Sequence, residues 1–234
     1  MYAMTNSAST AARAPMAMRF RPVLSTPAAA AEIDPLDRLG AAVKFEKNRT
    51  IYFEGDDAQH CYKVKSGTVR LCKVTEDGRR QIAAFLTADD LFGWTDQGFY
   101  GFSAEAVTDV TLEKFSRARI EDTVKASPAL GRRVLTMLST QLASAHDHLL
   151  LLGRMTAAER IASFLLDLVR RQHRGLSIEL AMNRKDVADY LGLTVETVSR
   201  TMSALKRKGI IAFAEPENVQ LKQSGALERL AMTA

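Results

Sequence analysis

Two short helices joined by a glycine-containing bend are predicted for residues 183–209, and this feature constrains the fold more than any other. The stretch reads NRKDVADYLGLTVETVSRTMSALKRKG. Asn183 and Thr194 are residue types that cap the start of a helix, and Gly209 follows the second helix as a terminator. Gly192 lies in the bend, where the missing Cβ relieves crowding.

The residues between these caps can supply a shared core. The small or apolar members of the pair are Val187, Ala188, Leu191, Leu193, Val198 and Leu205. Ala188 is small where the two helices must approach closely. This order of small, glycine and apolar positions predicts a helix-turn-helix, whose second helix enters the DNA major groove. A purely structural helical hairpin is the alternative.

The second helix carries side chains that match the edges of bases. Glu196, Ser199 and Arg200 are i, i+3 and i+4 neighbours and therefore share one face. Arg200 can bond to guanine O6 and N7, and Glu196 can accept from a cytosine amine. Val195 or Ser199 can touch a thymine methyl. We predict that these four residues read bases, although Glu196 and Arg200 could also form a surface ion pair that orients Arg200.

Other residues around this motif are candidates for contacts with DNA phosphates, which fix register without reading sequence. They are Asn183, Arg184, Thr194, Thr197, Lys206 and Lys208. The lysines could instead be solvated surface residues. After Gly209, the segments IIAFAE and NVQLKQ predict two strands separated by Pro216 and Glu217, which would form a wing.

A heptad pattern precedes the helix-turn-helix, in the helix predicted over residues 128–153. Its apolar seam has spacings of 3, 4, 3, 4 and 3 and consists of Leu135, Leu138, Leu142, Ala145, Leu149 and Leu152. Such a narrow stripe buries itself against a second helix. We therefore predict a homodimer, with packing of the helix on its own domain as the alternative.

The remaining regions complete an α+β chain. Residues 1–34 are rich in Ala, Ser, Thr, Met and Pro and predict a mobile tail, with a targeting peptide as the alternative. Residues 35–127 contain short β segments and turn signals such as Asp77-Gly78, which predict an antiparallel β-barrel or jelly roll. Residues 154–234 would form a winged helix-turn-helix domain. Thr156 and Glu159 form a predicted capping box at its start.

Composition narrows the classes of function. The formal net charge is +5, and the region from Arg154 onward holds thirteen Lys or Arg against nine Asp or Glu, which permits an acidic partner. Charge alone leaves nucleic acid, the cytoplasmic face of a membrane and acidic proteins open. No apolar run approaches the roughly 20 residues that cross a bilayer, so we expect a cytoplasmic protein without membrane contact. We find no pattern for an enzyme: no nucleophile–base pairing, phosphate loop or metal cluster.

The order of barrel, heptad helix and winged helix-turn-helix resembles the CRP/FNR superfamily of bacterial transcription regulators. The most specific segments are SGTVRL, DGRRQIAAFL, DDLFGW and NRKDVADYLGLTVETVSRTMSALKRKGII. Glu196, Ser199 and Arg200 resemble the E-x-x-S-R pattern of the FNR/FixK branch. This resemblance implies a homodimer that binds double-stranded DNA at a palindrome with TTGA-like half-sites. By resemblance, the hairpin at Asp77, Gly78 and Arg79 is a candidate contact for RNA polymerase.

The departures from the family matter as much. Gly93-Trp94 and Phe102-Ser103 stand where cyclic-AMP-binding relatives have Gly-Glu and Arg-Ser. A cyclic phosphate would lose its arginine partner, so cyclic-nucleotide binding is not expected. The N-terminal cysteine cluster of oxygen-sensing relatives is missing, so an iron–sulfur cluster is not expected either. The resemblance thus implies a FixK-like regulator without cofactor or metal. The alternative is an effector-gated regulator whose pocket is lined by Trp94, Phe99, Tyr100 and Phe102.

Cys61 and Cys72 are the two cysteines of the chain. If Ser66-Gly67 were a two-residue hairpin turn, the cysteines would lie opposite each other and could form a disulfide. Two buried thiols that act as small apolar residues are the simpler interpretation in a reducing compartment.

Overall fold

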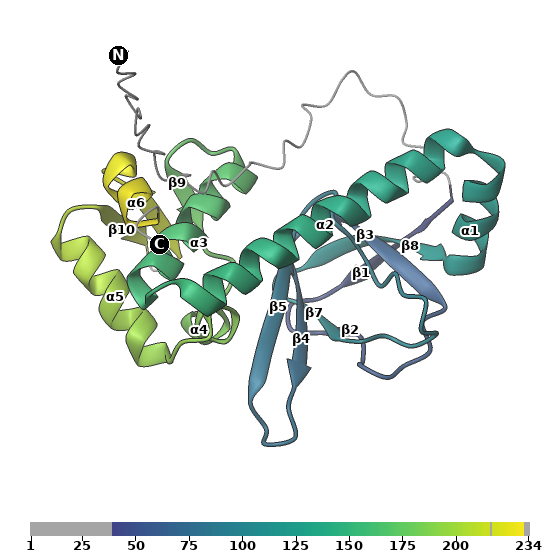
Figure 1. Ribbon diagram of the computed structural model, residues 1–234, viewed down its shortest axis with the longest axis horizontal. Coiled ribbons are helices and arrows are strands. Elements are labelled where there is room, and N and C mark those ends of the chain that lie inside the picture. Colours follow the sequence, from purple (N-terminus) through teal and green to yellow (C-terminus); the bar gives the residue numbers. More distant parts are fainter. Residues whose placement is uncertain (1–38, 216, 232–234) are drawn as a thin grey trace, which may run out of the picture.

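The computed structural model describes residues 39–215 and 217–231. The predicted mobile tail at 1–34 lies outside the described residues, as does Pro216 in the predicted wing turn. Figure 1 shows the β-rich domain and the second, mostly helical domain, with the long helix α2 (Pro128–Arg154) running between them.

The N-terminal domain consists of two antiparallel sheets, which confirms the predicted β-barrel or jelly roll. One sheet has the order β1-β8-β3-β6, with β1 (Ala41–Phe45), β8 (Val110–Ser116), β3 (His60–Ser66) and β6 (Leu91–Phe92). The other has the order β2-β7-β4-β5, with β2 (Thr50–Tyr52), β7 (Ser103–Ala106), β4 (Val69–Val74) and β5 (Arg80–Leu86). Inward residues such as Val64, Val69 and Leu112 have no exposed surface, because the two sheets face each other across a shared core.

The predicted hairpin at Asp77-Gly78 is confirmed. It joins β4 to β5, and the Thr75 N–H donates to the Arg79 carbonyl oxygen at 2.9 Å. Gly78 adopts φ +79°, a left-handed conformation that glycine reaches without a Cβ clash. The hairpin projects away from the rest of the barrel (Figure 1).

Helix α1 (Arg117–Ala126) follows the barrel, and α2 begins after Ser127. The Ser127 hydroxyl oxygen accepts the Leu130 N–H, and Pro128 occupies the first turn, where its missing N–H leaves no bond unmade. Val134 packs with the barrel, whereas Leu151 packs with the C-terminal domain. One continuous helix therefore contributes to the cores of both domains.

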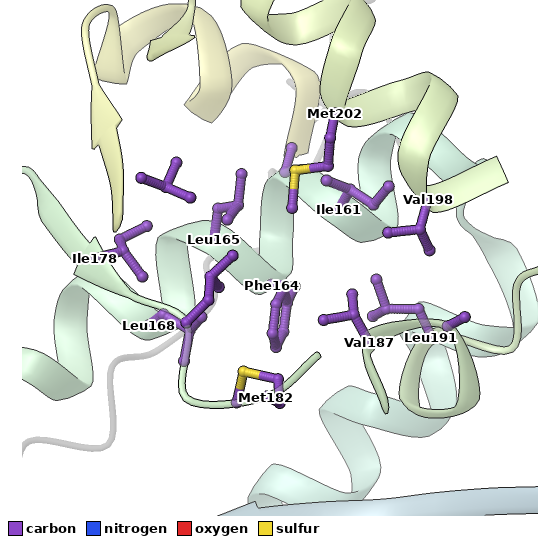
Figure 2. Close-up of a cluster of buried hydrophobic side chains, with 14 of the residues drawn as sticks. Ile161, Phe164, Leu165, Leu168, Ile178, Met182, Val187, Leu191, Val198 and Met202 are labelled. Carbon is purple, nitrogen blue, oxygen red and sulfur yellow. The ribbon is translucent and has the colours of Figure 1, made fainter. Parts of the chain in front are cut away.

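The C-terminal domain surrounds a second core, part of which is drawn in Figure 2. This core also includes Cys72, Ile82, Phe85 and Val107 of the barrel. Its elements are α3 (Ala157–Gln172), β9 (Ser177–Glu179), α4 (Arg184–Leu191), α5 (Val195–Arg207), β10 (Ile211–Glu215), β11 (Asn218–Leu221) and α6 (Ser224–Ala231). The three strands form one antiparallel sheet in the order β10-β11-β9, so the predicted wing strands are present. The predicted capping box is also confirmed, since the Thr156 N–H donates to Glu159 Oε2 at 2.7 Å.

Helices α4 and α5 form the predicted helix-turn-helix. The Asn183 side chain accepts the Asp186 N–H at 2.9 Å, and the Thr194 hydroxyl oxygen accepts the Thr197 N–H at 3.1 Å. Gly192 adopts φ +61° in the bend. The apolar faces of both helices point into the core against α3 (Figure 2), where Val187, Leu191 and Val198 are fully buried.

The interpretation of Cys61 and Cys72 as two buried thiols is confirmed, and the alternative that places them opposite each other in a disulfide is not. Strands β3 and β4 belong to different sheets, so Cys61 pairs with Phe115 and Cys72 with Ser103 and Ile82. The chain crosses between sheets after Ser66 and does not form a two-residue hairpin. Both cysteines are free thiols, and burial raises the pKa of Cys61 to about 12 and that of Cys72 to about 11. They are buried, protonated side chains of poor reactivity.

Substitution of Gly192, in the bend between α4 and α5, should lower the stability of the protein. In Gly192→Ala, the new Cβ would lie 3.3 Å from Leu152 Cδ2 on a backbone at positive φ. We expect the free energy of unfolding to fall by about 1–2 kcal/mol, measured by urea denaturation at a fixed protein concentration. Gly153→Ala is the matched control, because Gly153 lies in α2 and a Cβ added there would meet open space. An equal loss in both variants would contradict this role of Gly192.

Candidate nucleic-acid interface

The predicted base-reading residues lie together on the exposed side of α5. Glu196, Ser199 and Arg200 are all exposed, and Val195 is 43% exposed at the start of the helix. Arg200 Nη2 lies 2.5 Å from Glu196 Oε1, with the two side chains 79% and 69% exposed. An exposed pair of this kind adds under about 1 kcal/mol to stability. Its main effect is to orient the Arg200 guanidinium while leaving it accessible.

Two further residues on this face were not predicted from the sequence. Ser203 and Arg207 line a shallow hollow on α5 together with Ser199 and Arg200. Ser203 follows Ser199 by four residues and Arg207 follows Arg200 by seven, and this spacing predicts that they share the same face of the helix. Ser203 and Arg207 therefore extend the polar face of α5 toward its C-terminus.

The two predicted threonines lie at the N-terminus of α5. Thr194 and Thr197 have their hydroxyl oxygens 2.9 Å apart, and Thr194 also caps the helix. The N-terminus of a helix attracts anions, because its first N–H groups are free and the helix dipole is positive there. This end of α5 is suited to a phosphate, and the residues predicted to read bases follow directly.

The predicted basic phosphate contacts are not equivalent. Arg184 lies with its guanidinium carbon 5.1 Å from the centre of the Phe213 ring, and burial lowers its pKa. Its Nη1 atom is buried, with no hydrogen-bond partner in the described part of the chain. The Lys206 ammonium lies 5.8 Å from the same ring, and both side chains line a cavity of about 570 Å³ next to the wing. Lys208 is exposed at the C-terminus of α5.

The heptad seam of α2 divides into two groups. Leu135, Leu142 and Leu149 are 64%, 58% and 65% exposed, and Ala145 between them is exposed as well. In contrast, Leu138 packs partly buried against the cluster around Cys61, and Leu152 packs against the core of the C-terminal domain. The helix therefore packs on its own chain along one edge and leaves an apolar stripe uncovered along the other.

The hairpin residues are exposed at its tip. Asp77 Oδ2 lies 2.6 Å from Arg79 Nε, and the Thr75 hydroxyl donates to Asp77 Oδ1 at 2.5 Å. The bonds from Thr75 and Arg79 lower the pKa of Asp77. Arg79 is 83% exposed. The tip is therefore a charged, ordered turn that is accessible to a partner.

The barrel interior contains aromatic rings. Tyr52 stacks on Tyr100 with centroids 3.6 Å apart, and Tyr62 stacks on Phe92 at 5.3 Å. Burial raises the pKa of Tyr52 and Tyr100 well above the usual range, so both phenols stay protonated. The Tyr100 hydroxyl donates to the His60 carbonyl oxygen at 2.7 Å.

The four aromatic residues considered for a ligand pocket do not lie together in this interior. Only Tyr100 belongs to the stack, whereas Phe99 and Phe102 are 47% and 40% exposed and Trp94 packs against the cluster around Cys61. The Ser103 hydroxyl oxygen accepts the Glu54 N–H at 3.0 Å. These positions are thus parts of the barrel's own structure or of its surface.

Within residues 39–215 and 217–231, no group of three or more His, Cys, Asp or Glu is arranged to hold a metal ion. In the same ranges, no helix has the length and apolar character needed to cross a membrane.

A β-barrel, a long connecting helix and a winged helix-turn-helix together define the architecture of CRP-type regulators. A family model described as a Crp-like helix-turn-helix domain matches residues 159–230, and one described as a cyclic nucleotide-binding domain matches residues 42–127. The structure of FixK2 from Bradyrhizobium japonicum superposes with a TM-score of 0.80 at 37% identity, over 83% of this chain and 98% of that one.

Two sequence relatives identify the branch of the superfamily to which the chain belongs. The nitrogen fixation regulation protein FixK of Azorhizobium caulinodans is 43% identical over 197 residues, which cover 82% of this chain and 79% of that protein. FixK of Rhizobium meliloti is 39% identical over 186 residues, covering 80% and 85%. The chain belongs to the CRP/FNR superfamily of DNA-binding transcription regulators, in its FixK-like branch.

Proposed function

We propose that the protein acts as a homodimer that binds an inverted repeat with TTGA-like half-sites and activates transcription there. The observation that carries this proposal is the accessible face of α5, where Glu196 orients Arg200 beside Ser199. A guanidinium that is mostly exposed and held in place by a carboxylate is suited to bidentate bonding to guanine. Glu196 retains a second carboxylate oxygen for a cytosine amine.

The dimer would form through the uncovered stripe of α2. Leu135, Leu142 and Leu149 follow one another at intervals of seven residues, and each leaves more than half of its side chain exposed. Exposed leucines at heptad spacing favour burial against a second copy of the same helix. A two-fold axis between the helices would then place two copies of α5 on two half-sites related by the same symmetry.

Phosphate contacts would fix this register. Thr194, Thr197 and Asn183 lie at helix N-termini, and Lys206 and Lys208 extend the basic surface at the other end of α5. Arg184 would contact a phosphate only at the mouth of the cavity that it lines. We assign these residues to positioning and the α5 face to base reading.

The same proposal includes binding to DNA without a small effector or an iron–sulfur cluster. The stacked rings of Tyr52, Tyr62, Phe92 and Tyr100 occupy the barrel core. Phe102 carries no charge at the position where an arginine would pair with a cyclic phosphate. Both observations support a barrel that serves as a scaffold.

RNA polymerase would contact the hairpin between β4 and β5. The ion pair of Asp77 and Arg79 is exposed at a projecting tip, with Gly78 forming the turn between them (Figure 1). Fixed charges on a projecting turn suit a small, transient interface.

If Arg200 reads a base, its removal should lower both the affinity for the DNA site and the selectivity among sequences. Arg200→Ala should weaken binding by about 1–3 kcal/mol and relax the preference at one base pair of each half-site. Lys206→Ala is the comparison variant, and it should weaken all sequences alike and flatten the salt dependence. Quantitative footprinting on single-base variants measures both effects. An unchanged base preference in Arg200→Ala would remove this residue from base reading.

The dimer stripe predicts a change in oligomeric state. Leu142→Asp or Leu149→Asp would place a carboxylate in the apolar stripe and should give monomers by analytical ultracentrifugation. Thr136→Asp is the control, because Thr136 is exposed on α2 at a heptad position outside the apolar seam. Intact dimers in both leucine variants would contradict the interface.

The hairpin predicts a separation of transcription from DNA binding. Asp77→Ala and Arg79→Ala should lower transcription in a reconstituted assay, because they remove charges from the tip but leave α5 unaltered. Their affinity for the DNA site should equal that of the wild type. Parallel losses of affinity and transcription would reject a polymerase contact here.

A further inference from the structure

We propose that an ion-pair network around the buried Asp186 is a positioning device, which orients the helix-turn-helix relative to the barrel and so sets the half-site spacing that the dimer accepts. This inference rests on the proposed function, since it concerns the geometry of the same DNA-binding dimer. Asp186, Arg70 and Arg80 act as positioning residues and make no contact with bases.

Asp186 connects the two domains directly. It lies in the first turn of α4 and is only 1% exposed. Arg70 on β4 donates from Nη1 to both carboxylate oxygens of Asp186, each at 3.1 Å. Arg80 on β5 donates from Nη2 to Asp186 Oδ1 at 2.5 Å. A single carboxylate of the helix-turn-helix is therefore held by two guanidinium groups from the barrel.

Each arginine also has a second acidic partner, which fixes its direction. Arg70 Nη2 lies 2.6 Å from Glu105 on the neighbouring strand β7. The Arg80 Nε atom donates to Asp189 Oδ2 at 2.8 Å, one turn further along α4. Charge-assisted bonds of a planar guanidinium are directional, and removal from water strengthens them. The network thus restricts both the separation and the rotation of α4 against the sheet.

Apolar and polar contacts at Tyr190 support the same orientation. The Tyr190 ring lies 5.2 Å from that of Phe85 on β5 and 4.1 Å from that of His148 on α2, in each case between ring centroids. Gln81 on β5 donates to the Tyr190 carbonyl oxygen at 3.4 Å. Helix α4 is therefore in contact with both the barrel and the helix that carries the dimer stripe.

This placement has a consequence for DNA. Half-sites of such dimers lie about one helical turn apart, or 34–36 Å over 10–10.5 base pairs. One added base pair moves a half-site by about 3.4 Å and rotates it by about 35°. A helix-turn-helix held by bonds of fixed direction cannot follow that change without breaking them. A loosened helix-turn-helix can follow it, and would tolerate several spacings.

The test is a competition assay on inverted repeats with constant half-sites and spacers that vary by one base pair. Arg80→Gln is the main variant, because Arg70 still pairs with Asp186 and the carboxylate is not left without a partner. Asp189→Asn removes the other end of the same contact from α4. Lys73→Gln is the matched control, since Lys73 forms its ion pair within the barrel, 2.6 Å from Glu54.

We expect the wild type to prefer one spacing over its neighbours by about tenfold or more, and both network variants to reduce this ratio to about threefold or less. Lys73→Gln should keep the wild-type ratio. An unchanged ratio in Arg80→Gln and Asp189→Asn, or an equal loss of affinity at every spacing, would overturn the inference. A wild type that does not prefer an inverted repeat over scrambled duplexes would instead overturn the proposed function.

Discussion

The proposed base-reading helix, α5, depends on an apolar core that it cannot supply alone. Helix α5 buries Val198, Met202 and Leu205 against α3 and α4, and this burial determines which of its faces remains in solvent. A helix of this length is marginally stable in isolation, so tertiary packing holds it in place. The proposed role of Arg200 and its neighbours follows from this packing, because the core leaves their side chains exposed.

Helix α2 connects the packing of the C-terminal domain to the packing of the barrel. Val134 belongs to the cluster of the barrel and Leu151 to that of the C-terminal domain, so the helix transmits the orientation of one core to the other. Its exposed edge carries the leucine stripe, and its other contacts include the ring of Tyr190. In a dimer, α2 would form the interface between the two protomers. It would therefore determine how the two copies of α5 are placed relative to each other.

Local signals in the sequence were sufficient for much of this structure. The caps at Asn183, Thr156 and Thr194 act within three residues of themselves, and the Asp77-Gly78 turn joins adjacent strands. Such features depend on short-range chemistry, which a single sequence displays directly. Helix α6, by contrast, carried no comparable signal and is stabilised by packing of Leu227 in the core.

Long-range relations could not be predicted in the same way. The apparent pairing of Cys61 with Cys72 depended on whether the chain turns back within one sheet or crosses to the other, and local residues do not decide that. Asp186 on α4, the partner that Arg70 and Arg80 share, lies more than one hundred residues away from both of them. The heptad pattern likewise could not show that Leu138 and Leu152 are covered by their own chain, while Leu142 is not.

We propose that two copies of α5, held in a fixed relation, recognise an inverted repeat without any added ligand. Selection of bound duplexes from a random pool by the purified, full-length protein is the decisive experiment. We expect enrichment of two TTGA-like half-sites in inverted orientation with one dominant spacing. Enrichment of isolated half-sites at variable spacing, or recovery of no common motif unless a small molecule is supplied, would contradict it.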